Sequence, residues 1–120
     1  MTIIKNAENL CTILRTEEEF ESAIEKGRTL AFILKDHSPP CTSLVDNFVS
    51  GGLKEILEAY EIRAVYLDLE NKRLVEIYQR FKVSCVPFIL AFEDGEKVGL
   101  SFSNIPLPKF LDKLEEWYRI

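Results

Sequence analysis

The sequence is short of the residues from which most metal sites and disulfide frameworks are built. It contains one histidine, His37, and three cysteines, Cys11, Cys41 and Cys85. An odd number of widely spaced cysteines fits neither a set of disulfides nor the paired ligands of a zinc site. We therefore expect three free thiols in a reducing compartment, and neither a metal nor another cofactor.

Long apolar runs and an excess of positive charge are also missing. No stretch of the sequence approaches the ~18 apolar residues of a membrane-spanning helix, and the first residues lack the basic and apolar regions of a signal peptide. The net charge of −5 argues against binding to nucleic acid or to anionic lipid. These absences predict a cytoplasmic protein without nucleic-acid or membrane partners, and they leave its oligomeric state open.

The chain does contain enough apolar sequence for one hydrophobic core. Hydrophobic residues make up 47% of its 120 residues and charged residues 29%, as in ordinary globular proteins. A chain of this length suits a single domain, and we assign residues 1–120 to it.

Apolar runs of strand length alternate with segments of helical spacing. The predicted strands are residues 11–14, which could begin as early as residue 3, 29–35, 63–68, 87–92 and 97–102. The predicted helices are one between Thr16 and Gly27, one over 41–60 that breaks at Gly51-Gly52, one from Asn71 to Phe81 and one after Pro106. The order β-α-β-α-β-α-β-β-α predicts an α/β fold, a central mixed sheet with helices on both faces.

Two local signals support these boundaries. Thr16 and Glu19 have the spacing of a capping box, in which each side chain accepts a hydrogen bond from the other residue's backbone at a helix start. Asp94-Gly95 is a turn dipeptide between the last two predicted strands, which favours a β-hairpin.

A proline-rich turn, His37-Ser38-Pro39-Pro40-Cys41, joins the second predicted strand to the following helix. We expect Ser38 to cap that helix by accepting a hydrogen bond from the Cys41 amide, because Pro40 has no N–H to donate. Cys41 then lies in the first turn, where the positive end of the helix favours a thiolate and burial disfavours one. His37 is either an exposed rim residue or a cation beside that thiolate.

Together with Val86-Pro87 before the fourth strand and the Asp94-Gly95 hairpin, this turn resembles the thioredoxin superfamily. The resemblance spans nearly the whole chain and implies a thioredoxin-like fold in which Pro87 follows a cis peptide bond and packs beside the turn. It also implies a groove along that proline. The expected groove residues are His37, Ser38, Pro39, Pro40, Val86, Pro87 and Ser103.

The turn also departs from the Cys-Gly-Pro-Cys motif of thioredoxins. Ser38 replaces the first cysteine, and Phe32 stands where thioredoxins carry a buried aspartate that assists proton transfer. The segment is locally similar to monothiol bacilliredoxins, which remove low-molecular-weight thiols from protein cysteines. Phosducin-like proteins also lack the first cysteine, and they bind partners without redox turnover.

Two functions therefore follow from the sequence. In the first, Cys41 carries out thiol–disulfide exchange on a client protein or removes a small thiol from it, and Cys85 or a low-molecular-weight thiol resolves the mixed disulfide. In the second, the domain is redox-inactive and binds a partner protein in the groove beside Val86-Pro87. Cys11 is expected in the core, as buried cysteines commonly are.

Overall fold

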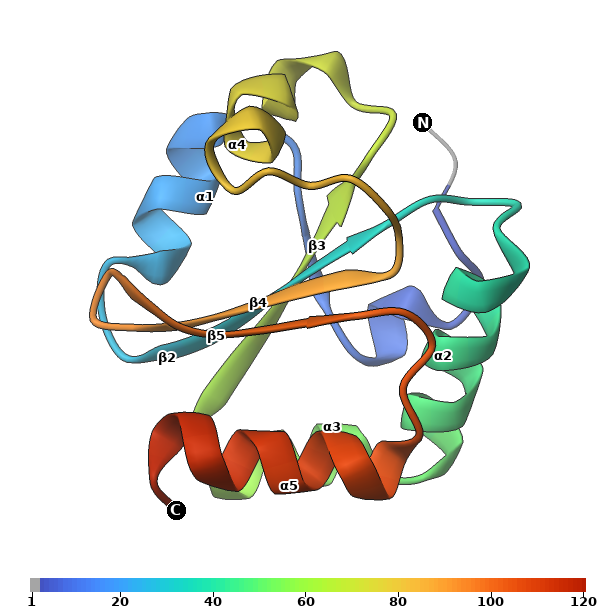
Figure 1. Ribbon diagram of the computed structural model, residues 1–120, viewed down its shortest axis with the longest axis vertical. Helices are drawn as coiled ribbons and strands as arrows, with labels where there is room; N and C mark the ends of the chain where they lie inside the picture. The colour runs from blue at the N-terminus through green and yellow to red at the C-terminus, as the bar shows by residue number, and fades with distance from the viewer. Residues whose placement is uncertain (1–2) are drawn as a thin grey trace.

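The central feature of the structure is a five-stranded sheet with the strand order β1-β3-β2-β4-β5. The computed structural model describes residues 3–120 (Figure 1). The strands are β1 (Thr12–Leu14), β2 (Arg28–Leu34), β3 (Ile62–Asp68), β4 (Phe88–Glu93) and β5 (Glu96–Phe102). The helices are α1 (Glu17–Ile24), α2 (Pro39–Ser50), α3 (Leu53–Ala59), α4 (Val75–Arg80) and α5 (Leu107–Tyr118), with 3-10 turns η1 (Ala7–Asn9) and η2 (Lys72–Leu74).

The sheet is parallel on one side and antiparallel on the other. Strands β1 and β2 both pair in parallel with β3. Strand β4 runs antiparallel to β2, and β5 runs antiparallel to β4. The predicted α/β fold with a mixed sheet is confirmed.

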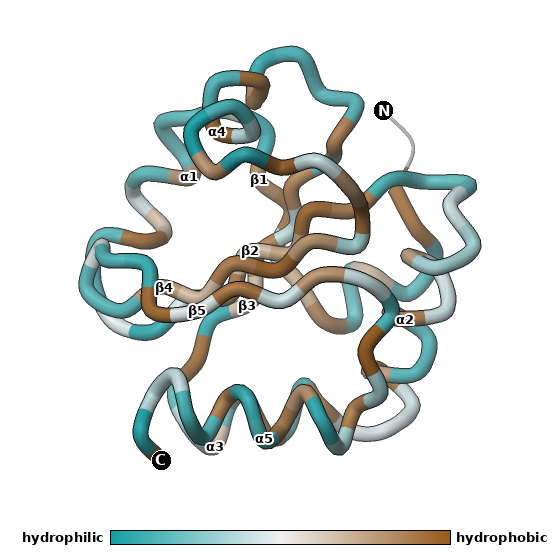
Figure 2. Tube along the Cα trace, in the orientation of Figure 1, coloured by the Kyte–Doolittle hydropathy of each residue, from teal (hydrophilic) through white to brown (hydrophobic). Residues whose placement is uncertain are grey.

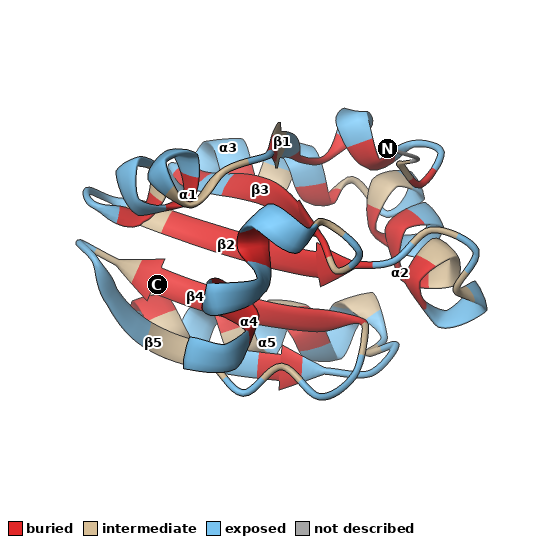
Figure 3. Cartoon of the chain, turned by 90° about the horizontal axis from the view of Figure 1, so that it is seen from above, coloured by how far each residue is buried: buried red, intermediate tan, exposed pale blue. Residues whose placement is uncertain are grey.

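Helices cover both faces of the sheet because successive side chains of its strands point to opposite sides. On β2, Leu30, Phe32 and Leu34 face α2, α3 and α5, whereas Ala31 and Ile33 face α1 and α4. The hydrophobic and buried parts of the chain coincide in the central strands (Figures 2 and 3). Within residues 3–120, none of the helices is both long and apolar enough to span a lipid bilayer.

The predicted capping box and hairpin turn both form. The Thr16 side chain accepts a hydrogen bond from the Glu19 amide at 3.1 Å, and Glu19 Oε1 accepts one from the Thr16 amide at 3.1 Å. Helix α1 begins at Glu17, directly after the N-cap residue Thr16. At the hairpin, Gly95 has a φ of 88°, a left-handed conformation that glycine adopts without strain.

The predicted helix over 41–60 is two helices, α2 and α3, separated at the glycine pair as expected. Gly52 has a φ of 80°, so the chain turns there and cannot continue as one helix. The helix predicted from Asn71 begins as the 3-10 turn η2 before it becomes α4. The Asn71 side chain caps η2 by accepting a hydrogen bond from the Arg73 amide at 3.0 Å.

The suggestion that the first strand could begin at residue 3 is wrong. The chain from Ala7 to Asn9 forms η1. Of residues 3–14, only Thr12–Leu14 pair with β3. The reason is the spacing of the apolar residues, because Ala7 and Leu10 lie three residues apart and both reach the core on the side of α2. This spacing fits a helical turn and not the two-residue period of a strand.

Candidate functional site

Helix α2 starts at the proline-rich turn, as predicted, but without the predicted side-chain cap. Ser38 occupies the N-cap position and Pro39 the first helical position. The Ser38 hydroxyl makes no capping hydrogen bond, and the first bond of the helix runs from the Thr42 amide to the Ser38 carbonyl at 3.0 Å. The prediction that Ser38 caps the Cys41 amide is therefore wrong. Consecutive prolines set the backbone at the start of α2 without help from the serine side chain.

The three thiols differ sharply in accessibility. The Cys41 side chain is fully buried, with 0% of its surface exposed, and it packs in the core on the α2 side of the sheet. Cys11 lies in the same core, as predicted, and burial raises its pKa far above the usual value. Cys85 is exposed, and all three cysteines are free. Cys41 therefore has no access to a disulfide outside the protein in this conformation.

The exposed thiol of Cys85 lies in a short loop that leads into β4. The peptide bond between Val86 and Pro87 is cis, and Pro87 is buried. The Pro87 carbonyl accepts a hydrogen bond from the Ser103 amide at 3.0 Å, which ties the loop to the end of β5. Val86 is partly buried and, within residues 3–120, makes no backbone hydrogen bond. Its N–H and C=O groups therefore have no backbone partner in this part of the structure.

The loop after β5 connects this region to α2. Asn104 donates a hydrogen bond from its side-chain amide to the Ser43 hydroxyl at 3.2 Å, two residues beyond Cys41. Ser103 is bonded to Pro87, so contacts run from α2 through the β5–α5 loop to the cis-proline loop. The structure thus links Pro87 and Ser103 to the helix that bears Cys41. We give the name proline groove to four residues, Cys85, Val86, Pro87 and Ser103, because the thioredoxin resemblance implies a groove along this loop.

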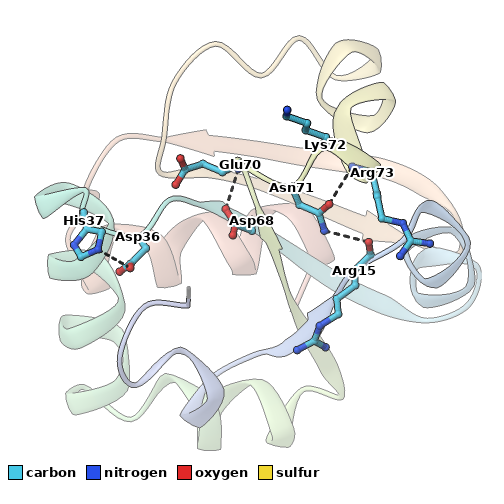
Figure 4. Close-up of a pocket in the computed structure, with 8 residues that line it drawn as sticks. All are labelled: Arg15, Asp36, His37, Asp68, Glu70, Asn71, Lys72 and Arg73. Atoms are coloured by element: carbon cyan, nitrogen blue, oxygen red, sulfur yellow. Dashed lines mark hydrogen bonds and ion pairs between the residues drawn. The ribbon is translucent and has the colours of Figure 1, made fainter. Parts of the chain in front are cut away.

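A concave region lies at the carboxyl ends of the three parallel strands. It has a volume of about 600 Å³. Its lining residues are Arg15, Asp36, His37, Asp68, Glu70, Asn71, Lys72 and Arg73 (Figure 4). We call this region the charged crevice. His37, which was predicted as a groove residue, lines this crevice.

Hydrogen bonds hold the walls of the charged crevice in place. Asn71 donates to the Arg15 carbonyl at 3.1 Å and accepts from the Arg73 amide at 3.0 Å, which joins the loops after β1 and β3. The Asp68 side chain accepts from the Glu70 amide at 2.9 Å. On the other wall, Asp36 pairs with the exposed imidazole of His37 at 3.1 Å. The loops are thereby arranged before any ligand arrives.

Comparison with solved structures identifies the architecture. No protein-family profile matches this sequence. Thioredoxin from Trypanosoma brucei brucei superposes with a TM-score of 0.74 at 16% identity, covering 99% of this chain and 100% of that one. A variant thioredoxin from Halobacterium salinarum gives 0.74 at 17% identity, with 98% and 96% covered. Schistosoma mansoni thioredoxin gives 0.73 at 22% identity, with 90% and 98% covered. The chain has the thioredoxin fold.

One polar group inside this thioredoxin fold is left without a hydrogen-bond partner. The Tyr66 hydroxyl is buried and, within residues 3–120, makes no hydrogen bond. Tyr66 lies on β3 directly beside Phe32 of β2. Burial, with smaller contributions from the charges of Asp68, Asp36 and Cys41, raises the pKa of Tyr66 to about 12, while the nearby backbone of Ile4 acts in the lowering direction. The Tyr66 hydroxyl is therefore buried on β3, directly beside the position on β2 where Phe32 replaces the aspartate of thioredoxins.

Sequence reasoning did not find most residues of the charged crevice. Arg15, Asp36 and Asp68 each follow one of the three parallel strands at or within two residues of its end. Carboxyl ends of parallel strands meet at one edge of a sheet, so the strand assignments already contained this signal. What they lacked was the strand order, which decides that these three ends are neighbours.

Proposed function

We propose that this protein exchanges thiols and disulfides with a client protein, and that Cys85 is the thiol that meets the client. The observation that carries the proposal is accessibility, because Cys85 is exposed while Cys11 and Cys41 are buried. A thiolate must reach a disulfide sulfur to attack it. The structural neighbours named as thioredoxins support redox chemistry in a chain of this fold.

The proposed reaction removes a small thiol from a client cysteine. The Cys85 thiolate attacks the small-thiol sulfur of a mixed disulfide, so that this sulfur bonds to Cys85 and the client sulfur leaves as a thiolate. The client thiolate takes a proton from water. A second small thiol then attacks the disulfide on Cys85, forms a small-molecule disulfide and releases Cys85 as a thiolate.

The client would dock along the cis-proline loop. Val86 has free backbone N–H and C=O groups, which an extended client segment can use as in β-strand addition. Phe102, the last residue of β5, is 59% exposed and lies next to Ser103. An apolar client side chain can therefore pack beside the backbone pairing and close to Cys85.

The role predicted for Cys41 requires a change of conformation. Its side chain is fully buried, so it cannot attack the client disulfide from its place in the core. Opening of the first turn of α2 would let Cys41 replace the small thiol in the second step, provided that its Cβ comes within roughly 4.5 Å of the Cβ of Cys85.

Alkylation of the folded protein with iodoacetamide tests the assignment, with each cysteine followed by mass spectrometry. We expect Cys85 to react about a thousandfold faster than Cys41 or more, because exposure of a core thiol by unfolding costs about 5 kcal/mol or more. Cys85→Ser should remove the fast phase, and Cys41→Ser and Cys11→Ser should leave it unchanged. If the alkylation rate of Cys41 is within about tenfold of that of Cys85, the proposal is wrong and Cys41 is the attacking thiol.

Turnover is tested with a peptide that carries a mixed disulfide to 2-mercaptoethanol, with free 2-mercaptoethanol as the reductant. The wild-type protein should accelerate release of the peptide thiol, and Cys85→Ser should not. Equal rates with both proteins would contradict the proposed reaction.

A second candidate function is partner binding without redox turnover. The free backbone groups of Val86 favour it, since they can pair with a partner whether or not a thiol reacts. Val86→Pro removes the N–H of Val86 and keeps Cys85. If this variant keeps the alkylation rate of Cys85 but loses turnover of the peptide, docking along Val86 precedes the thiol chemistry. If Cys85→Ser still binds the peptide and the wild type shows no turnover, the binding function stands alone.

A further inference from the structure

The charged crevice occupies the place in the sheet where open α/β folds bind ligands. The connections after β1 and β3 pass to the face that carries α1 and α4, whereas the connection after β2 passes to the face that carries α2. The chain therefore leaves adjacent strands β3 and β2 in opposite directions. A crevice forms outside their carboxyl ends, as it does at the switch points of other open sheets.

The charges in this crevice are separated along its length. Asp36, His37 and Glu70 lie toward one end, Arg15 and Arg73 lie toward the other, and Asp68 and Lys72 lie between them (Figure 4). A small anion would meet the carboxylates as well as the guanidinium groups. A ligand with a positive and a negative group at opposite ends matches the separation.

Asp68 is the residue that most strongly indicates a ligand. It is only 4% exposed, yet its carboxylate lines the crevice. The Glu70 amide donates the one hydrogen bond that the side chain accepts within residues 3–120. Asp68 forms no ion pair with a side chain in that part of the structure, although buried carboxylates are usually paired. A cationic group of a ligand would supply the missing partner.

We propose that the charged crevice binds short peptides through their free ends. The peptide ammonium group lies against Asp68 and Asp36, and its carboxylate lies against Arg15 and Arg73. Arginine suits the second role because its planar donors match the two carboxylate oxygens. The volume of about 600 Å³ is in the range of small-molecule sites. The binding uses no thiol and is independent of the function proposed for Cys85.

The proposal is tested by titrating the full chain with trialanine and following backbone amide signals by two-dimensional NMR. The amides of His37, Glu70, Asn71 and Arg73 should shift together. N-acetyl-trialanine tests the ammonium contact, and trialanine amide tests the carboxylate contact. Each blocked peptide should bind about tenfold more weakly than trialanine, since each loses a charge-assisted contact.

Variants test which side chains contact each end of the peptide. Asp68→Asn should weaken trialanine about tenfold and leave N-acetyl-trialanine unaffected, because that peptide has no ammonium group to lose. The double variant Arg15→Gln, Arg73→Gln should weaken trialanine and leave trialanine amide unaffected. Asp112→Asn is the matched control, an exposed carboxylate on α5 outside the crevice, and should change nothing.

Three results would overturn the proposal. One is the absence of any shift at these amides with trialanine at about 20 mM, well above a millimolar dissociation constant. Another is equal affinity for free and blocked peptides. The third is a set of shifts confined to Val86 and Ser103, which would place binding in the proline groove. Asp36→Asn serves as the second carboxylate variant if Asp68→Asn does not fold, and Cys85→Ser should bind trialanine like the wild type.

Discussion

The proline groove and the charged crevice differ in their chemistry. The groove contains a thiol and the backbone groups of Val86, with the exposed Phe102 next to Ser103. The crevice is lined by three carboxylates, three Arg or Lys side chains and the imidazole of His37, and no cysteine or methionine lines it. The first region suits extended backbone and sulfur chemistry, whereas the second suits recognition of charge.

The difference follows from how each region is built. The groove forms where the antiparallel strands β4 and β5 meet the loops that enter and leave them, and one hydrogen bond from Ser103 to Pro87 closes it. The crevice forms where parallel strands end and their connections diverge. One short turn, His37 to Cys41, contributes its imidazole to the crevice and its thiol to the core.

The largest expected effect separates the buried thiol from the exposed one. A Cβ added at Gly99 would lie about 2.3 Å from the ring of Trp117, so Gly99→Ala must push α5 away from β5. Such overpacking costs about 1–3 kcal/mol. If Cys41 becomes reachable only by unfolding, its alkylation should speed up about tenfold while Cys85 is unaffected. The measurement is site-resolved alkylation beside urea unfolding.

Lys97→Ala, also on β5 and exposed, is the control for this prediction and should change neither rate. A different outcome would be that Gly99→Ala lowers stability but iodoacetamide alkylates Cys41 at the wild-type rate. In that case Cys41 is reached by a local opening of α2, and it belongs functionally to the proline groove.

A smaller effect concerns Tyr66, whose pKa is influenced by both the crevice carboxylates and Cys41. Its unpaired hydroxyl is desolvated on folding, so Tyr66→Phe should raise the free energy of unfolding by about 1 kcal/mol. Tyr78→Phe is a matched control, since the Tyr78 hydroxyl donates to the Asp68 carbonyl and its removal should lower stability by about 1 kcal/mol. Urea unfolding measures both.

A loss of stability in Tyr66→Phe would have a different meaning. It would show that the hydroxyl is hydrogen-bonded in solution. A bond to Cys41 would be detected as a change in the alkylation rate of Cys41 in this variant.

The smallest effect is a pH dependence confined to the crevice side. The Arg15 and Thr16 amides donate to the Glu19 carboxylate, and the Arg15 bond is the main cause of its lowered pKa. A carboxylate with a lowered folded-state pKa stabilises the fold above its unfolded-state pKa, and this contribution is lost as the pH falls through the folded value. Amide signals of Arg15 and Thr16 should shift on acidification below about pH 4.3.

Glu19→Gln is the matched variant, because it keeps an oxygen acceptor without a titrating group. It should abolish the shift at Thr16 over this range, whereas Val86 in the proline groove should show no transition in either protein. An acid transition at Thr16 that persists in Glu19→Gln would contradict the assignment to Glu19.

The strands and helices could be predicted because their signals are local. The Thr16–Glu19 capping box, the glycine pair and the Asp94-Gly95 turn each act over a few residues and fix boundaries that the structure reproduces within about two residues. The misassigned segment before β1 is instructive, since Ala7 and Leu10 are apolar in any short window and only their core contacts distinguish a turn from a strand.

The candidate sites were less predictable because they depend on side-chain directions and on strand order. The position of Cys41 in the first turn of α2 follows from sequence, but its complete burial depends on packing among α2, β2 and α5. The hydroxyl direction of Ser38 is likewise a tertiary property. Asp68 and Arg15 become neighbours because β1 pairs with β3, and Asp36 joins them because β2 pairs with the other edge of β3.

The side-chain amide of Asn71 gives the crevice a mechanical property. Because the Asn71 side chain belongs to the loop after β3 and donates to the carbonyl of Arg15, the loops after β1 and β3 separate only if this hydrogen bond breaks. The Arg73 amide bonds the same side chain and holds it in place, on the timescale of hydrogen exchange. Exchange at the Arg73 amide therefore reports how often the Asn71 side chain leaves this position, and an occupant that contacts both loops should slow it.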